Sequence, residues 1–137
     1  MTKRGWNIGR LAPALFAYFL QPPCATGVFP FIQAAPFDTT YMGQTIKEAT
    51  FGGIFACLPL LWVLPFAGRL LRLRCRERST RTVMGVVVVL LAMGVVVALF
   101  DAEMAGILQR YYADFSFMFL AASVLLAFIV NENLRPG

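Results

Sequence analysis

The sequence predicts an all-α membrane protein, a polytopic bundle of about four transmembrane helices whose first segment is broken by prolines. Of its 137 residues, 59% are hydrophobic and only 14% are charged, whereas a soluble domain carries about 25% charged residues. The charges also gather in short connectors that separate long uncharged stretches. Because a membrane helix needs about 20 apolar residues, these stretches are predicted spans within a single transmembrane domain, 1–137.

Three of the predicted spans follow from uncharged stretches of suitable length. The strongest is 82–100, which as a helix would be about 28 Å long and has no charge or proline. The stretch 49–68 is also uncharged, but it contains two prolines. The last span, 115–130, is slightly short, and Tyr111 and Tyr112 would extend it to the membrane surface as part of an aromatic belt.

The first predicted span covers 11–32 and is the least regular. Residues 11–20 read as a helix, and Pro22 and Pro23 then break or kink it. The segment is therefore either one kinked span or a helix followed by a re-entrant Phe- and Pro-rich stretch. The sequence leaves open whether 22–36 is a span, a re-entrant segment or an outer loop.

A cleaved signal peptide is the competing interpretation of this N-terminal part. A basic leader followed by the apolar stretch 11–20 is typical of one. Pro22 and Pro23 stand where a cleavage site needs small residues, so a retained segment is favoured.

The basic residues predict how the chain is oriented. Lys and Arg concentrate in cytoplasmic loops, and here all of them except Lys47 and Arg110 fall in the leader 1–10, the connector 69–81 or the C-terminal tail. Five of the seven acids fall in the other two connectors. This partition predicts four spans in a bacterial-type inner (plasma) membrane, with both termini cytoplasmic.

The connector 69–81 is a basic cytoplasmic loop. Its arginines either act only as a topological retention signal or bind anionic lipid headgroups, each worth about 1 kcal/mol near a membrane surface. Nucleic acid is not an expected partner, because no aromatic interleaving or recognition motif accompanies the charges. The candidate headgroup-binding residues are Arg69, Arg72, Arg74, Arg76, Arg78 and Arg81.

Several chemistries lack their residues. The chain has no histidine, which excludes His-dependent acid–base catalysis, nucleophile activation and zinc sites. Cys24, Cys57 and Cys75 form no C-x-x-C pair, and no phosphate-binding glycine motif occurs. We therefore expect no metal and no cofactor, and no catalytic residue is identified.

The outer connector holds the most informative polar residues, Asp101, Glu103, Arg110 and Asp114. Arg110 and Asp114 share a helix face and are expected to form a local ion pair. The alternative is that the carboxylates bind a divalent cation or act as acid–base groups at the membrane surface.

Small and polar residues inside the predicted spans suggest two further features. Gly94 and Ala98, like the small residues 52, 53 and 56, allow close helix contact, within the chain or between copies or membrane partners. The polar residues of the first segment, Gln21, Thr26 and Gln33, would either satisfy backbone groups freed by prolines or line a path.

Three segments resemble the C-terminal part of large bacterial GT-C glycosyltransferase-like membrane proteins. They are YFLQPP at 18–23, FPFI at 29–32 and GILQRYYADF at 106–115. The resemblance covers residues 11–130 and implies a relation to lipid-linked-sugar transferases, whose catalytic acids lie in an outer loop that nothing here matches. It implies a non-catalytic, truncated or accessory protein with a structural or lipid-carrier-binding role. The alternatives are a small transporter or flippase-like subunit using Gln21, Thr26 and Gln33, and an enzyme using outer-loop carboxylates.

Overall fold

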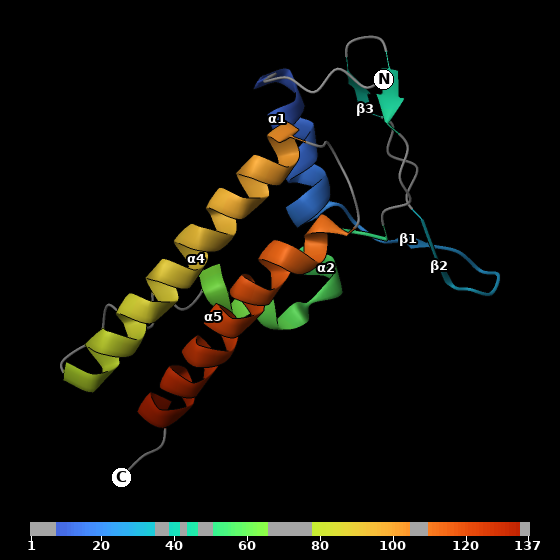
Figure 1. Ribbon diagram of the computed structural model, residues 1–137. Helices are drawn as coiled ribbons and strands as arrows, with labels where there is room; N and C mark the ends of the chain where they lie inside the picture. The colour runs from blue at the N-terminus through green and yellow to red at the C-terminus, as the bar shows by residue number, and fades with distance from the viewer. Residues whose placement is uncertain are drawn as a thin grey trace.

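Two long antiparallel helices form the body of the molecule (Figure 1). The structure is a computed structural model that describes residues 8–34, 39–41, 44–46, 51–65, 78–104 and 110–134. Helix α4 spans Arg78–Met104 and helix α5 spans Tyr111–Leu134. They contain the segments Thr80–Glu103 and Tyr111–Glu132, which are long and apolar enough to cross a membrane. The described part of the chain is thus mostly helical, with two membrane-length helices where 82–100 and 115–130 predict spans.

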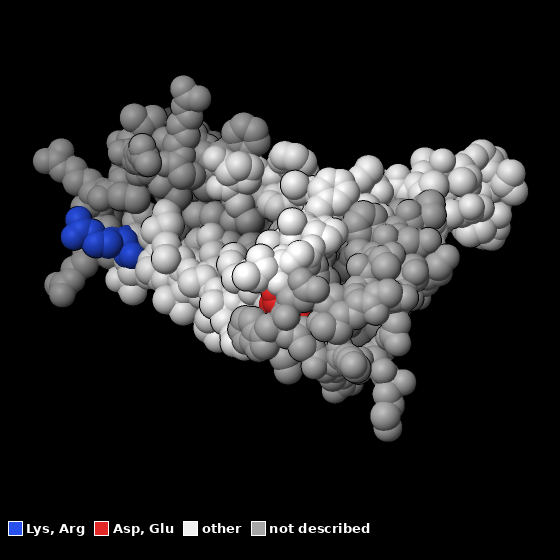
Figure 2. All heavy atoms as spheres, turned by 90° about the horizontal axis from the view of Figure 1, so that it is seen from above, with Lys and Arg blue, Asp and Glu red and all other residues white. Residues whose placement is uncertain are grey.

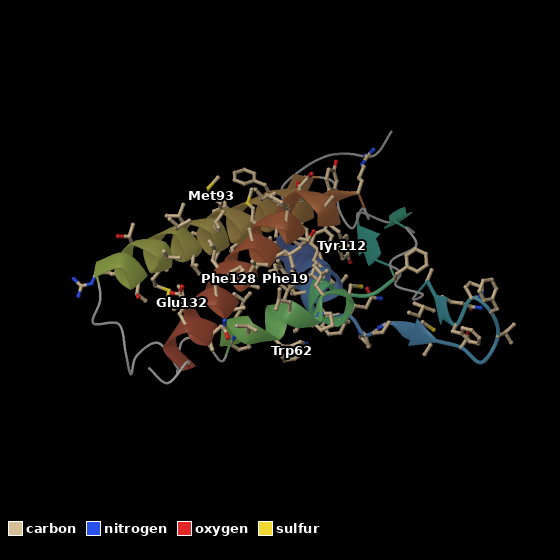
Figure 3. All side chains as sticks on the ribbon, turned by 90° about the horizontal axis from the view of Figure 1, so that it is seen from below. Phe19, Trp62, Met93, Tyr112, Phe128 and Glu132 are labelled. Carbon is tan, nitrogen blue, oxygen red and sulfur yellow. The ribbon has the colours of Figure 1, made fainter. Side chains whose placement is uncertain are left out.

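Burial distinguishes these helices from the core helices of a soluble protein. In the most apolar window of each, only 17% of α4 and 33% of α5 is buried. Val89, Met93 and Phe100 are about half exposed on α4, and Figure 3 shows Met93 pointing away from the other helices. Exposed apolar surface of this extent is suited to contact with lipid.

Small residues allow α4 and α5 to pack closely. Ala98, Ala102 and Ala122 are fully buried. A Cβ atom on Gly94 would lie 2.8 Å from Cε2 of Phe119, so the two helices meet without room for a side chain at this point. The close contact expected at Gly94 and Ala98 is confirmed as packing within the chain.

The first segment is a helix followed by a hairpin, not one continuous helix over 11–32. Helix α1 (Ile8–Leu15) continues into the π-helix η1 (Phe16–Leu20). The backbone then leaves the helical region at Gln21 (φ −56°, ψ 125°), as expected for a residue that precedes proline. Strand β1 (Cys24–Ala25) pairs antiparallel with β2 (Ile32–Gln33).

The second predicted span is also divided. After the hairpin of β3 (Thr39–Tyr41) and β4 (Gln44–Ile46), helix α2 covers Ile54–Cys57 and the 3-10 helix η2 covers Pro59–Trp62. Between them Leu58 is extended (φ −124°, ψ 84°), because the following proline disfavours the helical region. Residues 51–65 therefore form α2 and, after the break at Leu58, η2 with a helical turn at 63–65, where 49–68 predicts one span.

Candidate functional site

The two broken segments meet at one point, where the chain approaches itself very closely. The backbone N–H of Gly53 donates a 2.7 Å hydrogen bond to the carbonyl of Gln21. A Cβ atom on Gly53 would lie 2.5 Å from the carbonyl carbon of Phe19, so only glycine fits. The neighbouring Gly52 has a φ of +131°, a conformation that glycine adopts readily. We call this contact the junction.

The packing on either side of the junction shows that the two segments follow each other along the long helices. Above it, Ile8 and Leu11 lie against the C-terminal end of α4. Below it, Val63 and Leu64 pack against the cluster that contains Val87. Helix α1–η1 therefore runs antiparallel to α4 beside its C-terminal part, whereas α2 packs against η1 and η2 packs against α5.

Aromatic rings pack η1 against α5. The Tyr18 ring lies 5.0 Å from the Tyr112 ring in an edge-on arrangement, and Phe19 lies 5.3 Å from Phe119. The Tyr112 hydroxyl donates a 2.8 Å hydrogen bond to the carbonyl of Ala17. Figure 3 shows Phe19 and Tyr112 in the interior of the molecule, so this end of the bundle is closely packed.

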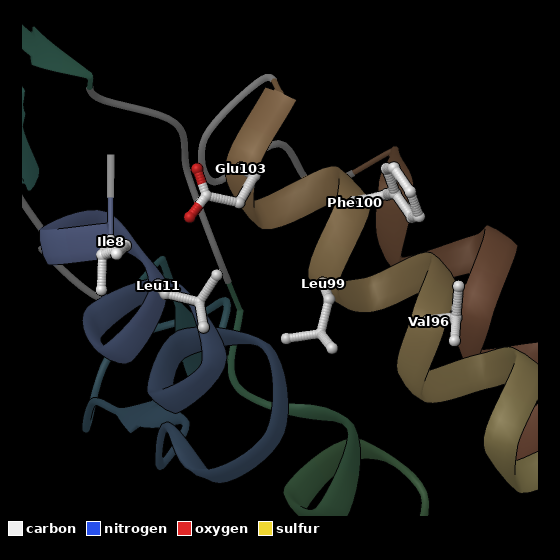
Figure 4. A pocket seen from close by; sticks show the side chains of 6 residues that line it. All are labelled: Ile8, Leu11, Val96, Leu99, Phe100 and Glu103. Carbon is white, nitrogen blue, oxygen red and sulfur yellow. The ribbon is translucent and has the colours of Figure 1, made fainter. Parts of the chain in front are cut away.

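Two apolar clefts lie between α1–η1 and α4. One, of about 460 Å³, is shown in Figure 4 and is lined by Ile8, Leu11, Val96, Leu99, Phe100 and Glu103. The other, of about 480 Å³, is lined by Ala12, Leu15, Phe16, Phe19, Leu20, Val95 and Leu99. Leu99 belongs to both clefts. Their walls are almost wholly hydrocarbon, which suits an apolar ligand.

Among the described residues, Glu103 is the only charged one that lines these clefts. Its side chain is 6% exposed, and Figure 4 shows the carboxylate turned from the end of α4 toward the first turn of α1. A helix N-terminus favours a nearby negative charge. The Glu103 carboxylate therefore lies between α4 and α1 at the end of the clefts.

The other outer-connector candidates lie near the end of α4 and the start of α5, where Asp101 and Asp114 are close enough for their charges to interact. Asp101 has a buried Oδ2 atom without a hydrogen-bond partner among the described residues. Asp114 lies exposed in the first turn of α5. Arg110 stacks over the Tyr111 ring, 5.3 Å from its centroid, and within the described part of the chain it forms no ion pair with Asp114. No group of three or more metal-ligating side chains occurs among the described residues.

The polar residues of the first segment do not line a common path. Gln21 is buried beside the junction, whereas Thr26 is half-buried and Gln33 is exposed on the β1–β2 hairpin. The Thr26 hydroxyl donates to the carbonyl of Val28, 3.1 Å away, so it orders the turn of the hairpin.

The basic connector is described only at its end. Arg78 and Arg81 form the start of α4, and the Arg81 side chain is exposed. Figure 2 shows the basic side chains that are visible from above at one end of the molecule, apart from the acids. The remaining candidates for headgroup binding, Arg69, Arg72, Arg74 and Arg76, lie outside the described residues.

Comparisons with protein-family models, with curated proteins and with solved structures found no match to this chain.

The clefts and the junction were not identified from the sequence as a site. The glycines of the junction were noted only as small residues that allow helix contact. The cleft residues are ordinary apolar residues of two segments far apart in the chain, and no local motif marks them.

Proposed function

We propose that the protein is a multi-pass protein of a bacterial-type inner membrane that holds the hydrocarbon chain of a lipid or lipid carrier without reacting with it. The observation that carries this proposal is the pair of apolar clefts that meet at Leu99. Ligand sites are typically concave and mostly apolar, with few polar groups. Apolar clefts beside a membrane-length helix would lie at the depth of the hydrocarbon, and their apolar lining suits an acyl or isoprenoid chain.

The resemblance to the C-terminal region of GT-C glycosyltransferase-like proteins is consistent with this proposal. A terminal membrane region that lacks the catalytic loop would retain contact with the lipid carrier. The enzyme alternative would use the outer-connector carboxylates Asp101, Glu103 and Asp114, of which Asp101 and Asp114 lie close together. The transporter alternative is weakened because Gln21 is buried away from Thr26 and Gln33.

The orientation that we propose differs from the sequence-based one at the first helix. The arginines at the start of α4 favour a cytoplasmic position for that end and an outer position for Glu103. In this proposal the start of α1 also lies at the outer end, because Ile8 lines the same cleft as Glu103. The junction then makes one crossing out of two short segments, and α4 and α5 make two more. We propose these three crossings in place of four spans with both termini cytoplasmic.

A photo-crosslinking experiment tests the lipid site. The purified full chain, reconstituted in vesicles, is irradiated with a polyprenyl phosphate that carries a diazirine in its chain. We expect Leu99→Trp to reduce the labelling strongly, because Leu99 lines both clefts and the larger indole takes up space where they meet. Val89→Trp is the matched control, since Val89 is exposed on the same helix and lines neither cleft. Equal labelling of both variants and the wild type would contradict the proposal.

Cysteine labelling of cells tests the orientation separately. In a background without the three native cysteines, we expect Ile8→Cys to react with a membrane-impermeant maleimide applied from outside. Glu132→Cys, near the end of α5, should react only after the membrane is permeabilised. Both positions are exposed in the protein, so access depends on the side of the membrane. Reaction of both cysteines from the same side would exclude three crossings.

A further inference from the structure

The β1–β2 hairpin presents a cluster of large apolar side chains that neither the clefts nor the helix packing uses. Val28 is 70% exposed, Phe29 is 81%, Phe31 is 63% and Ile32 is 55%. The Phe29 and Phe31 rings contact each other edge-on, with centroids 6.1 Å apart. We call these four residues the apolar tip. A contiguous exposed patch of this kind indicates a binding partner.

The position of the hairpin indicates what that partner is. The hairpin leaves the bundle after Gln21 and projects away at the end where α5 begins (Figure 1). Tyr111 and Tyr112 start α5 at this end, and tyrosines are typical of the region where a membrane helix meets the headgroups. The two membrane-length helices therefore place the apolar tip near the surface of the bilayer.

The backbone of the hairpin limits how deeply the apolar tip can enter lipid. Cys24 pairs with Gln33 and Ala25 with Ile32, and the N–H of Thr26 donates to the carbonyl of Phe31 over 2.8 Å. The outer edges of two paired strands still carry backbone groups that need a partner. Water and headgroups satisfy them at the membrane surface, whereas hydrocarbon does not.

The charge of the segment favours lipid over an aqueous or ionic partner. No charged residue occurs between 11 and 37, so the hairpin itself supplies no ionic group that could fix the orientation of a protein partner. Apolar side chains at the interface lower the free energy without such fixed pairing.

We infer that the apolar tip is an interfacial anchor that inserts Val28, Phe29, Phe31 and Ile32 between the headgroups and the upper acyl chains at the α4–α5 connector end. The inference rests on the proposed membrane insertion of α4 and α5. It assigns to residues 24–33 an interfacial hairpin, one that neither spans the membrane nor lies free in water.

Fluorescence quenching tests the depth of the apolar tip. Phe29→Cys, in a background without the native cysteines, is labelled with an environment-sensitive dye, and the full chain is reconstituted in phosphatidylcholine–phosphatidylglycerol vesicles. We expect lipids with a nitroxide near the headgroup to remove more fluorescence than lipids with a nitroxide deep in the chain. Met93→Cys on α4 is the matched control and should show the reverse order.

Two outcomes would overturn the inference while leaving the membrane insertion of α4 intact. With Met93→Cys quenched by the deep nitroxide, quenching of the Phe29 dye only by aqueous iodide would place the apolar tip in water or on a protein. Stronger quenching by the deep nitroxide would place it in the hydrocarbon. If the Met93 dye itself escapes every lipid quencher, the proposed membrane insertion fails, and the anchor fails with it. Val28→Cys repeats the measurement in case the Phe29 variant does not fold.

Discussion

Replacing Gly53 with alanine tests whether the junction holds the two short segments together. The added Cβ atom would lie 2.5 Å from both the carbonyl carbon and the carbonyl oxygen of Phe19, and 2.7 Å from the nitrogen of Leu20. These are backbone atoms, so no side-chain rotation relieves the overlap. The segments must separate, and the hydrogen bond from Gly53 to Gln21 lengthens with them.

The magnitude follows from these two effects. Overpacking a closely packed site typically costs about 1–3 kcal/mol, and a lost hydrogen bond adds about 0.5–1.5 kcal/mol. We therefore expect Gly53→Ala to lower the free energy of unfolding by about 2–4 kcal/mol. The assay is unfolding of the detergent-solubilised full chain with increasing dodecyl sulfate, followed by far-ultraviolet circular dichroism.

Two other glycines supply controls of graded severity. A Cβ on Gly85 would meet nothing within 4 Å, so Gly85→Ala should change the stability by less than about 0.5 kcal/mol. A Cβ on Gly94 would lie 2.8 Å from Cε2 of Phe119, a ring edge that can move, so Gly94→Ala should fall between the other two. If Gly53→Ala unfolds at the same dodecyl sulfate concentration as Gly85→Ala, the junction does not exist as described.

The same unfolding assay checks two further predictions. Tyr112→Phe should lower the free energy of unfolding by about 0.5–1.5 kcal/mol, since it leaves the carbonyl of Ala17 without its donor. The control is Ser123→Ala, because the Ser123 hydroxyl bonds within its own helix. Equal losses of stability in the two variants would refute this role of Tyr112. Phe115→Ala should lower the free energy of unfolding by about 3–5 kcal/mol, because Phe115 is fully buried among the aromatic rings. Phe128→Ala should lower it little, because Phe128 is 64% exposed. Equal losses of stability in the two variants would mean that the buried cluster is misplaced.

The two long helices could be predicted from the sequence because their signal is local. A stretch without charge or proline such as 82–100 needs no information from the rest of the chain to be recognised as a membrane-length helix. Its boundaries could not be predicted in the same way. Helix α4 begins at Arg78 and continues to Met104, since charged residues at its ends can reach water without breaking the backbone pattern.

The first half of the described chain could be predicted only as uncharged and rich in proline. Residues 49–68 look like one span because their composition is apolar, but the short helices α2 and η2 are held in place by contacts with distant residues. The approach of Gly53 to Phe19 is such a contact. The composition of a segment indicates whether it prefers lipid or water, but it does not indicate which neighbour supplies its missing hydrogen bonds.

The candidate site shows the same limit for single residues. The spacing of Arg110 and Asp114 favours an ion pair on a helix, yet Arg110 lies in the turn before α5 and stacks on Tyr111. An exposed pair of this kind contributes only about 0–1 kcal/mol, so a neighbouring ring competes easily. Leu99, which joins the two clefts, has no local feature that separates it from the other aliphatic residues of α4.

The side of the membrane on which α1 starts differs between the prediction from charges and the three-crossing arrangement that we propose, and the reason is physical. Charge counting treats each long uncharged stretch as one complete crossing, so two stretches before α4 return the chain to the side from which it started. In the arrangement that we propose, the junction joins parts of these stretches into a single crossing, because α1–η1 packs beside the C-terminal part of α4 and Leu64 packs against the cluster that contains Val87. One crossing fewer reverses the predicted side of α1. The arginines at the start of α4 keep their cytoplasmic position in both schemes, so the side of Ile8 alone decides between them.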